Sequence, residues 1–125
     1  MFTPPPRQIP PPFIIEDALA GLEGNLPLLK TLVQMVIDQS TSDMAAIRSG
    51  VAASNSMALA AAAHRLKGSL GAIAAMSAYQ ACSALNSLAR AGAKDSYAIG
   101  MTHLEEELGR LLPNLQAWLA DKPMN

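Results

Sequence analysis

The sequence has one cysteine, few aromatic residues and no long apolar run. The cysteine, Cys82, excludes a disulfide within the chain and any metal or redox motif of the Cys-x-x-Cys type, and we expect it to be a small core residue. No apolar stretch approaches the roughly 20 residues that span a bilayer, and the N-terminal segment lacks the apolar region of a signal peptide. These absences predict a cytoplasmic protein whose 125 residues make no contact with a membrane.

Strong net charge of either sign is also missing. The formal net charge is -1 at pH 7, and the Lys and Arg residues are scattered, which is not typical of a nucleic-acid-binding protein. Half of the residues are hydrophobic, and most of these are Ala, Leu, Met and Ile, a composition that favours α-helix. With 125 residues the chain can bury one core, so we expect one domain. We also expect a monomer.

Proline dominates the N-terminal segment, residues 1–12. Six of these residues are Pro, which favours an extended polyproline conformation, and we interpret the segment as a stiff linker or tail. Residues 13–121 are then the folded domain, and residues 122–125 are a C-terminal tail. At the start of this domain, residues 13–22 predict a short helix that covers one end of a helical bundle.

A long helix is expected over residues 26–53. Asn25 is a good N-cap, and Pro27 fits the first turn, where its missing N–H costs nothing. The apolar residues stay on nearly the same face of a helix throughout this range, which favours one helix over two shorter ones. The pattern does not decide whether this helix is kinked near Ser40. The polar cluster Ser54-Asn55-Ser56 then ends this helix and begins the next.

Three further helices complete the expected fold. The second long helix runs to about Ala75, Ser77 caps the third, Gly92 ends it, and Asp95 or Ser96 begins the last. Short links between amphipathic helices place neighbours antiparallel. The sequence therefore predicts an all-α fold, an antiparallel four-helix bundle with a short N-terminal capping helix.

The second long helix places a histidine, His64, on a face without bulky side chains. At about 100° per residue, one side of the helix gathers apolar residues that we expect in the core: Leu59, Ala62, Ala63, Leu66, Leu70 and Ile73. The opposite side carries His64 with small and polar residues: Met57, Ala60, Ala61, Lys67, Gly68, Gly71 and Ala75. His64 is therefore expected to point away from the core.

The residues after His64 suit transfer of a group to the ring. A neutral imidazole is a nucleophile near pH 7, and Lys67, one turn on, can place an ammonium group beside a phosphoryl group on that ring. Gly68 and Gly71 remove side chains next to it, although each glycine costs a helix roughly 1 kcal/mol relative to Ala. Two such glycines in an Ala-rich helix indicate close approach by a second protein.

The stretch Ala63-His64-Arg65-Leu66-Lys67-Gly68-Ser69-Leu70-Gly71 is similar to the pattern Ala-His-x-Leu-Lys-Gly-Ser-x-Gly of histidine-containing phosphotransfer (HPt) domains of phosphorelays. The resemblance covers about residues 20–120 in architecture. It implies that His64 is the phosphoacceptor, that Lys67 assists the phosphoryl group, and that the two glycines give docking clearance. The docking face that it implies consists of Met57, Ala60, Ala61, Arg65, Gly68, Gly71 and Ala75.

The resemblance also implies a mechanism and partners. The phosphoryl group would pass reversibly between His64 and an aspartate of a response-regulator receiver domain. The chain would be a phosphocarrier and not an enzyme, without a cofactor of its own, because the receiver would hold Mg²⁺. The Pro-rich linker is consistent with a C-terminal module of a hybrid sensor histidine kinase, which would tether the domain to the inner membrane.

Two residues depart from the family pattern. Ala74 stands where members often have glycine, and Asn86 stands where they often have glutamate. We expect the first to affect the helix end or the docking surface and the second to remove a surface charge. Neither is expected to touch the phosphoacceptor.

Two other functions remain open from the sequence. A bundle of the same fold could bind a receiver domain or another regulatory protein without carrying phosphate. A histidine kinase dimerisation domain ranks third, because such a domain needs an ATP-binding partner domain and usually has an acidic residue where this chain has Arg65.

Overall fold

The computed structural model describes residues 11–121, and these residues form helices without any strand. The elements are α1 (Ile15–Ala20), α2 (Leu26–Ala52), α3 (Ser56–Ala72), α4 (Met76–Ala91), the 3-10 turn η1 (Lys94–Ser96) and α5 (Tyr97–Ala120). The predicted all-α fold is confirmed. The predicted linker and C-terminal tail lie almost wholly outside the described residues.

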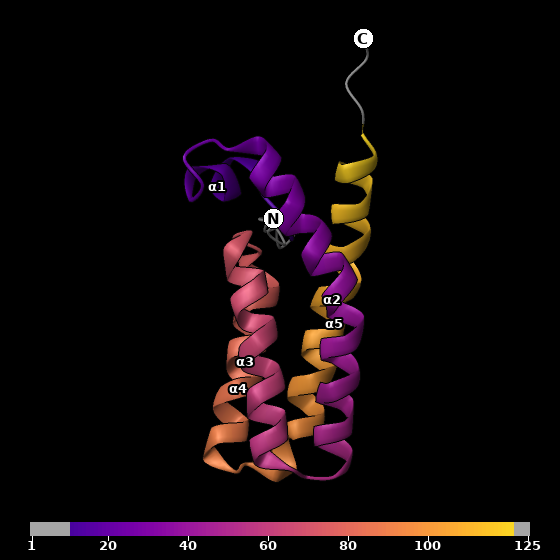
Figure 1. Ribbon diagram of the computed structural model, residues 1–125. Helices are drawn as coiled ribbons and strands as arrows, with labels where there is room; N and C mark the ends of the chain where they lie inside the picture. The colour runs from indigo at the N-terminus through magenta and orange to yellow at the C-terminus, as the bar shows by residue number, and fades with distance from the viewer. Residues whose placement is uncertain (1–10, 122–125) are drawn as a thin grey trace, which may run out of the picture.

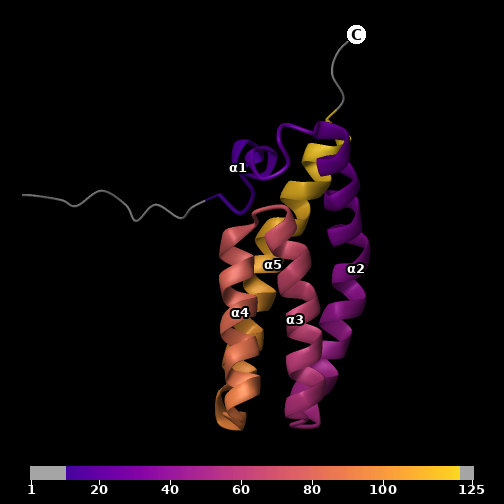
Figure 2. The same cartoon turned by 60° about the vertical axis from the view of Figure 1, so that its left-hand side comes forward.

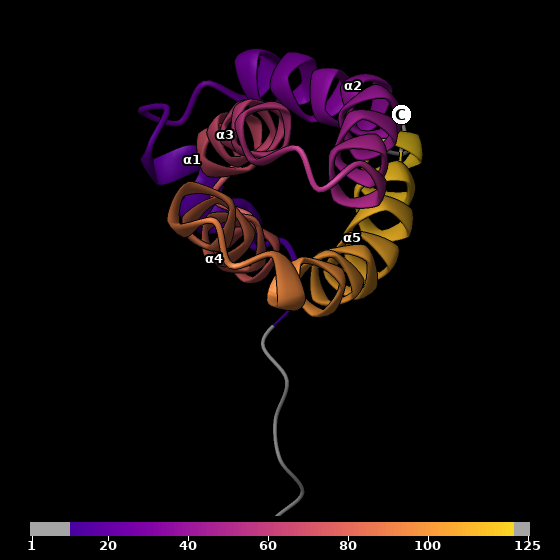
Figure 3. The same cartoon turned by 90° about the horizontal axis from the view of Figure 1, so that it is seen from below.

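The four long helices form an antiparallel bundle (Figure 1). Seen end-on, they follow the order α3, α2, α5, α4 around a ring, and each packs against its two neighbours (Figure 3). The short helix α1 lies across the end at which α3 and α4 are joined (Figure 2). It begins two residues later and ends two residues earlier than the predicted range of 13–22. No helix in residues 11–121 is long and apolar enough to cross a membrane.

The long helix α2 begins and continues as its sequence predicts. The Asn25 side chain accepts a hydrogen bond from the Leu28 N–H at 3.1 Å, and Pro27 occupies the first turn. The helix runs through the polar patch without a break. The buried Ser40 hydroxyl in this patch donates to the Ile37 carbonyl at 3.0 Å, so its burial leaves no polar group unsatisfied. One long helix, and not two short ones, is therefore the observed arrangement.

Most predicted core residues are buried. The apolar residues predicted for the buried side of α3, which include Leu59, Leu66 and Leu70, are each at most 1% exposed. We call this set the apolar stripe of α3. At the opposite end from α1, the Tyr97 hydroxyl lies 2.7 Å from the Ser56 hydroxyl and 3.4 Å from the Ala89 carbonyl. This phenol joins the start of α3, the end of α4 and the start of α5.

The turn between α3 and α4 differs from the prediction. The helix expected to reach about Ala75 ends at Ala72, and α4 begins at Met76 without a side-chain cap, so Ser77 is not the cap. Ala74 has a left-handed φ of 54°, its N–H donates to the Gly71 carbonyl, and the Ala75 N–H donates to the Leu70 carbonyl. These two bonds form a Schellman turn, which reverses the chain three residues earlier than the pattern indicates.

The left-handed Ala74 predicts a stabilising substitution. The left-handed conformation costs an L-residue with a side chain roughly 1–2 kcal/mol of steric strain, and it costs glycine none. Relief of this strain outweighs the larger conformational entropy that glycine has in the unfolded chain. We expect Ala74→Gly to raise the free energy of unfolding by about 0.5–1 kcal/mol. Urea denaturation followed by circular dichroism measures the change. The matched control Ala72→Gly, in the last turn of α3, should lower it, and a loss of similar size at both positions would contradict the strain at Ala74.

Candidate functional site

The site is built on the exposed side of α3. Because Ala63 and Leu66 are buried, the helical period turns His64, which lies between them, outward, and its side chain is exposed. Within the described residues, no hydrogen bond or ion pair holds the imidazole. Both ring nitrogens are therefore free for a reaction with a second molecule.

A shallow hollow lies beside His64, between α3 and α4. Its lining is Ala60, Ala61 and His64 from α3, with Asn86 and Arg90 from α4. Asn86 is only 6% exposed, and its Nδ2 donates to the Ala60 carbonyl at 2.9 Å, which fixes α4 against α3 next to the histidine. The prediction that Asn86 lies at the surface is therefore wrong.

Arg90 is the site residue that the sequence did not reveal. It is exposed, it lines the hollow with His64, and in residues 11–121 its side chain makes no hydrogen bond or ion pair. A guanidinium group at this place offers hydrogen-bond donors to a partner that docks over the histidine. Arg90 follows His64 by 26 positions on another helix, so only the packing of α4 on α3 brings the two together.

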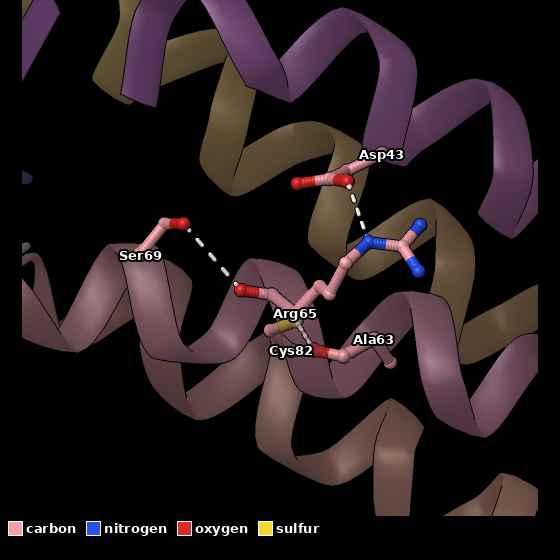
Figure 4. Close-up of polar contacts among 5 residues, drawn as sticks. All are labelled: Asp43, Ala63, Arg65, Ser69 and Cys82. Carbon is pink, nitrogen blue, oxygen red and sulfur yellow. Dashed lines mark hydrogen bonds and ion pairs between the residues drawn. The ribbon is translucent and has the colours of Figure 1, made fainter. Parts of the chain in front are cut away.

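Arg65, next to His64, points to the other side of α3. Its Nε donates to Oδ1 of Asp43 on α2 at 3.3 Å, and the two form an ion pair. The side chain of Arg65 is 59% exposed and that of Asp43 only 9%. Figure 4 shows the guanidinium reaching towards α2 with its two terminal nitrogens turned away from the carboxylate. Arg65 is therefore anchored at its Nε, and its outer donors face solvent.

Two further residues near the site are Lys67 on α3 and Cys82 on α4. Lys67 is half-buried, and in the described part of the chain its ammonium group has no hydrogen-bond or ion-pair partner. Cys82 is buried, and its thiol donates to the Ala63 carbonyl at 3.0 Å (Figure 4). Burial raises the pKa of this thiol to about 12, an effect that the charge of Lys67 opposes and that of Asp43 reinforces. Cys82 is thus a neutral core residue at pH 7, as predicted.

The two glycines predicted to give docking clearance have different surroundings. Both are exposed, but a β-carbon on Gly68 would meet nothing within 4 Å, whereas one on Gly71 would lie 3.2 Å from Cε2 of Tyr79 on α4. Gly68 therefore leaves open space beside the histidine. Gly71 makes room for the Tyr79 ring of the same molecule.

All but one of the residues predicted for the docking face are at least partly accessible, while docking itself stays a prediction. Ala60 is half-buried, and the other five are exposed: Met57, Ala61, Arg65, Gly68 and Gly71. Among residues 11–121, Met57 is the most exposed of the large apolar side chains, at 85%. Ala75 is fully buried, so its place on this face is a wrong prediction. Because the Schellman turn ends α3 at Ala72, Ala75 no longer follows the helical period of α3 and instead precedes the first residue of α4.

Comparison with known proteins adds one finding. The family model described as "Hpt domain" matches residues 31–118, which include all of α3, α4 and the hollow between them. Neither a curated protein nor a solved structure matches the chain.

The difference between the two glycines can be measured as stability. In open space within a helix, Gly68→Ala should raise the free energy of unfolding by about 0.5–1 kcal/mol. Gly71→Ala should raise it by less, because the added carbon forces the Tyr79 ring to move. Urea denaturation is the measurement, with Gly109→Ala as the matched control, since Gly109 is also a helical glycine with nothing within 4 Å. Equal gains at Gly68 and Gly71 would contradict the proposed constraint from Tyr79.

Proposed function

The chain belongs to the Hpt domain family, and on this basis we propose that His64 is the residue that accepts and passes on the phosphoryl group. Hpt domains are phosphocarriers of two-component signalling, and they interact with response-regulator receiver domains. The resemblance inferred from the sequence motif is therefore confirmed at the level of the family. The proposal is carried by the imidazole of His64, which is exposed in the middle of a firmly packed helix and has no hydrogen-bond or ion-pair partner among residues 11–121.

The chain has a second histidine, His103 on α5, and its surroundings disfavour a phosphoryl group. His103 Nε2 lies 3.9 Å from a carboxylate oxygen of Glu107, in a helix that also carries Glu105 and Glu106. These negative charges would repel a phosphoryl group. Helix α3 instead carries no Asp or Glu, and His64 precedes Lys67 there by one helical turn.

The proposed step is an in-line displacement. A neutral ring nitrogen of His64 attacks the phosphorus of a receiver aspartyl phosphate, a P–N bond forms, and the P–O bond to the carboxylate breaks with its electron pair leaving on the aspartate. The same step in reverse passes the group to another receiver. Positioning and charge stabilisation dominate such transfers, and Mg²⁺ on the receiver would supply most of the charge stabilisation.

The neighbours of His64 have supporting roles in this proposal. Lys67 balances charge on the phosphoryl group, and Gly68 lets the receiver backbone approach the ring. The exposed Met57 and the small side chains of Ala60 and Ala61 offer apolar contact area. The place of the domain in a hybrid kinase stays a prediction from the sequence.

Labelling by a phosphorylated receiver domain tests the phosphoacceptor. Incubation with ³²P-labelled receiver should place acid-labile, alkali-stable phosphate on the chain. His64→Gln should abolish this label, because it removes the nucleophile, and the matched variant His103→Gln should keep it. Equal labelling of wild type and His64→Gln would refute the assignment, and binding of the receiver without any label would favour an interaction module that carries no phosphate.

The open space at Gly68 generates a separate prediction. Gly68→Gln should leave the bundle folded and slow transfer from the receiver at least about tenfold, since a displacement of 1 Å can cost two orders of magnitude in rate. Circular dichroism checks the fold, and rapid-quench kinetics measure the transfer. Gly109→Gln is the matched control on α5, where a side chain also meets open space, and it should transfer at the wild-type rate. Unchanged transfer in Gly68→Gln would exclude close approach at this position.

A further inference from the structure

The charges of this protein are segregated along the chain, although their sum is close to zero. No Asp or Glu occurs between Asp43 and Asp95, and α3 and α4 both lie within this interval. The charged residues of these two helices are all basic: Arg65, Lys67 and Arg90. The acids of the described chain lie instead on or near α1, α2, η1 and α5. The only charged side chains that α3 and α4 themselves bring to the side of His64 are therefore basic, and one of them, Arg65, is paired with Asp43 of α2.

Two of these cations flank the histidine on opposite sides. Arg65 is directed to the α2 side and is anchored there by Asp43. Arg90 lies on the α4 side, in the hollow that it shares with His64. Asp43 is mostly buried and holds Arg65 at its Nε, and within the described part of the chain no hydrogen bond engages the two outer nitrogens (Figure 4).

Anchoring matters for recognition. A free arginine loses rotamer entropy when it binds a partner, at a cost of roughly 0.5–1.5 kcal/mol, whereas the Nε contact already restricts Arg65 before binding. The planar guanidinium favours carboxylate partners, to which it can donate two parallel hydrogen bonds. Arg65 and Arg90 thus offer guanidinium donors on two sides of His64 to an acidic surface placed over it.

We propose that Arg65, Lys67 and Arg90 form a basic surface that steers and orients an acidic face of the receiver domain during docking. This inference rests on the proposed phosphotransfer function. Surfaces of opposite charge accelerate association and fix register, and the acceleration falls as salt screens the charges over about 8–10 Å. The arginines act in the encounter of the two proteins, and the transfer step itself remains with His64.

Transfer kinetics as a function of salt test the proposal. With a ³²P-labelled receiver domain below saturation, the wild-type transfer rate should fall about tenfold between 20 and 300 mM NaCl. Arg90→Gln and the double variant Arg65→Gln/Arg90→Gln should transfer several-fold more slowly at low salt, show a weaker salt dependence, and approach the wild-type rate at high salt. Arg48→Gln is the matched control, because it removes the same charge where α2 meets α5, next to Glu105.

A second phosphodonor separates failure of this inference from failure of the proposed function. Phosphoramidate phosphorylates histidine without a docking protein, and the arginine variants should accept phosphate from it within about twofold of wild type. A larger decrease would mean that the arginines act on the phosphoryl group and not on docking, which would overturn the inference. A salt-independent rate, or equal effects of Arg48→Gln and Arg90→Gln, would also overturn it while leaving His64 as phosphoacceptor. No label on His64 from either donor would refute the proposed function.

Discussion

The burial of one side of α3 against α2 and α4 is the interaction on which the site depends. Each buried leucine of this stripe contributes about 1.5–3 kcal/mol, and Leu59, Leu66 and Leu70 are all at most 1% exposed. Rotating α3 far enough to bury His64 would bring these leucines into water, at a cost similar to the entire stability of a small domain. Turning the imidazole inward would therefore cost about as much free energy as unfolding the domain.

The fold was predictable wherever local pattern decides it. Asn25, Pro27 and a single apolar phase predicted α2 as one helix, and it runs from Leu26 to Ala52. The α3–α4 turn was not predictable in detail, because Ala74 adopts a conformation that sequences usually indicate with glycine. With alanine there, the pattern continues as helix, and Ala75 was assigned to the wrong face.

Only the part of the site that lies on α3 was predictable from the sequence. The 3.6-residue period gave the direction of His64 and the exposure of Gly68, since both follow from the burial of their neighbours on α3. Asn86, Arg90 and the Tyr79 ring beside Gly71 belong to α4, and the register of α4 on α3 depends on packing that no spacing encodes. The basic character of α3 and α4 was visible in the sequence, but the net charge of -1 conceals it.

The ring order α3, α2, α5, α4 has a consequence for how the chain folds. Three of its four helix contacts join helices that follow one another in the sequence, and only the contact of α5 with α2 joins distant ones. Mostly local contacts give a low contact order, which is typical of domains that fold in microseconds to milliseconds. The entropy of closing a long loop is concentrated in one event, the docking of α5 on α2. The α3–α4 hairpin, which carries His64, can assemble without waiting for it.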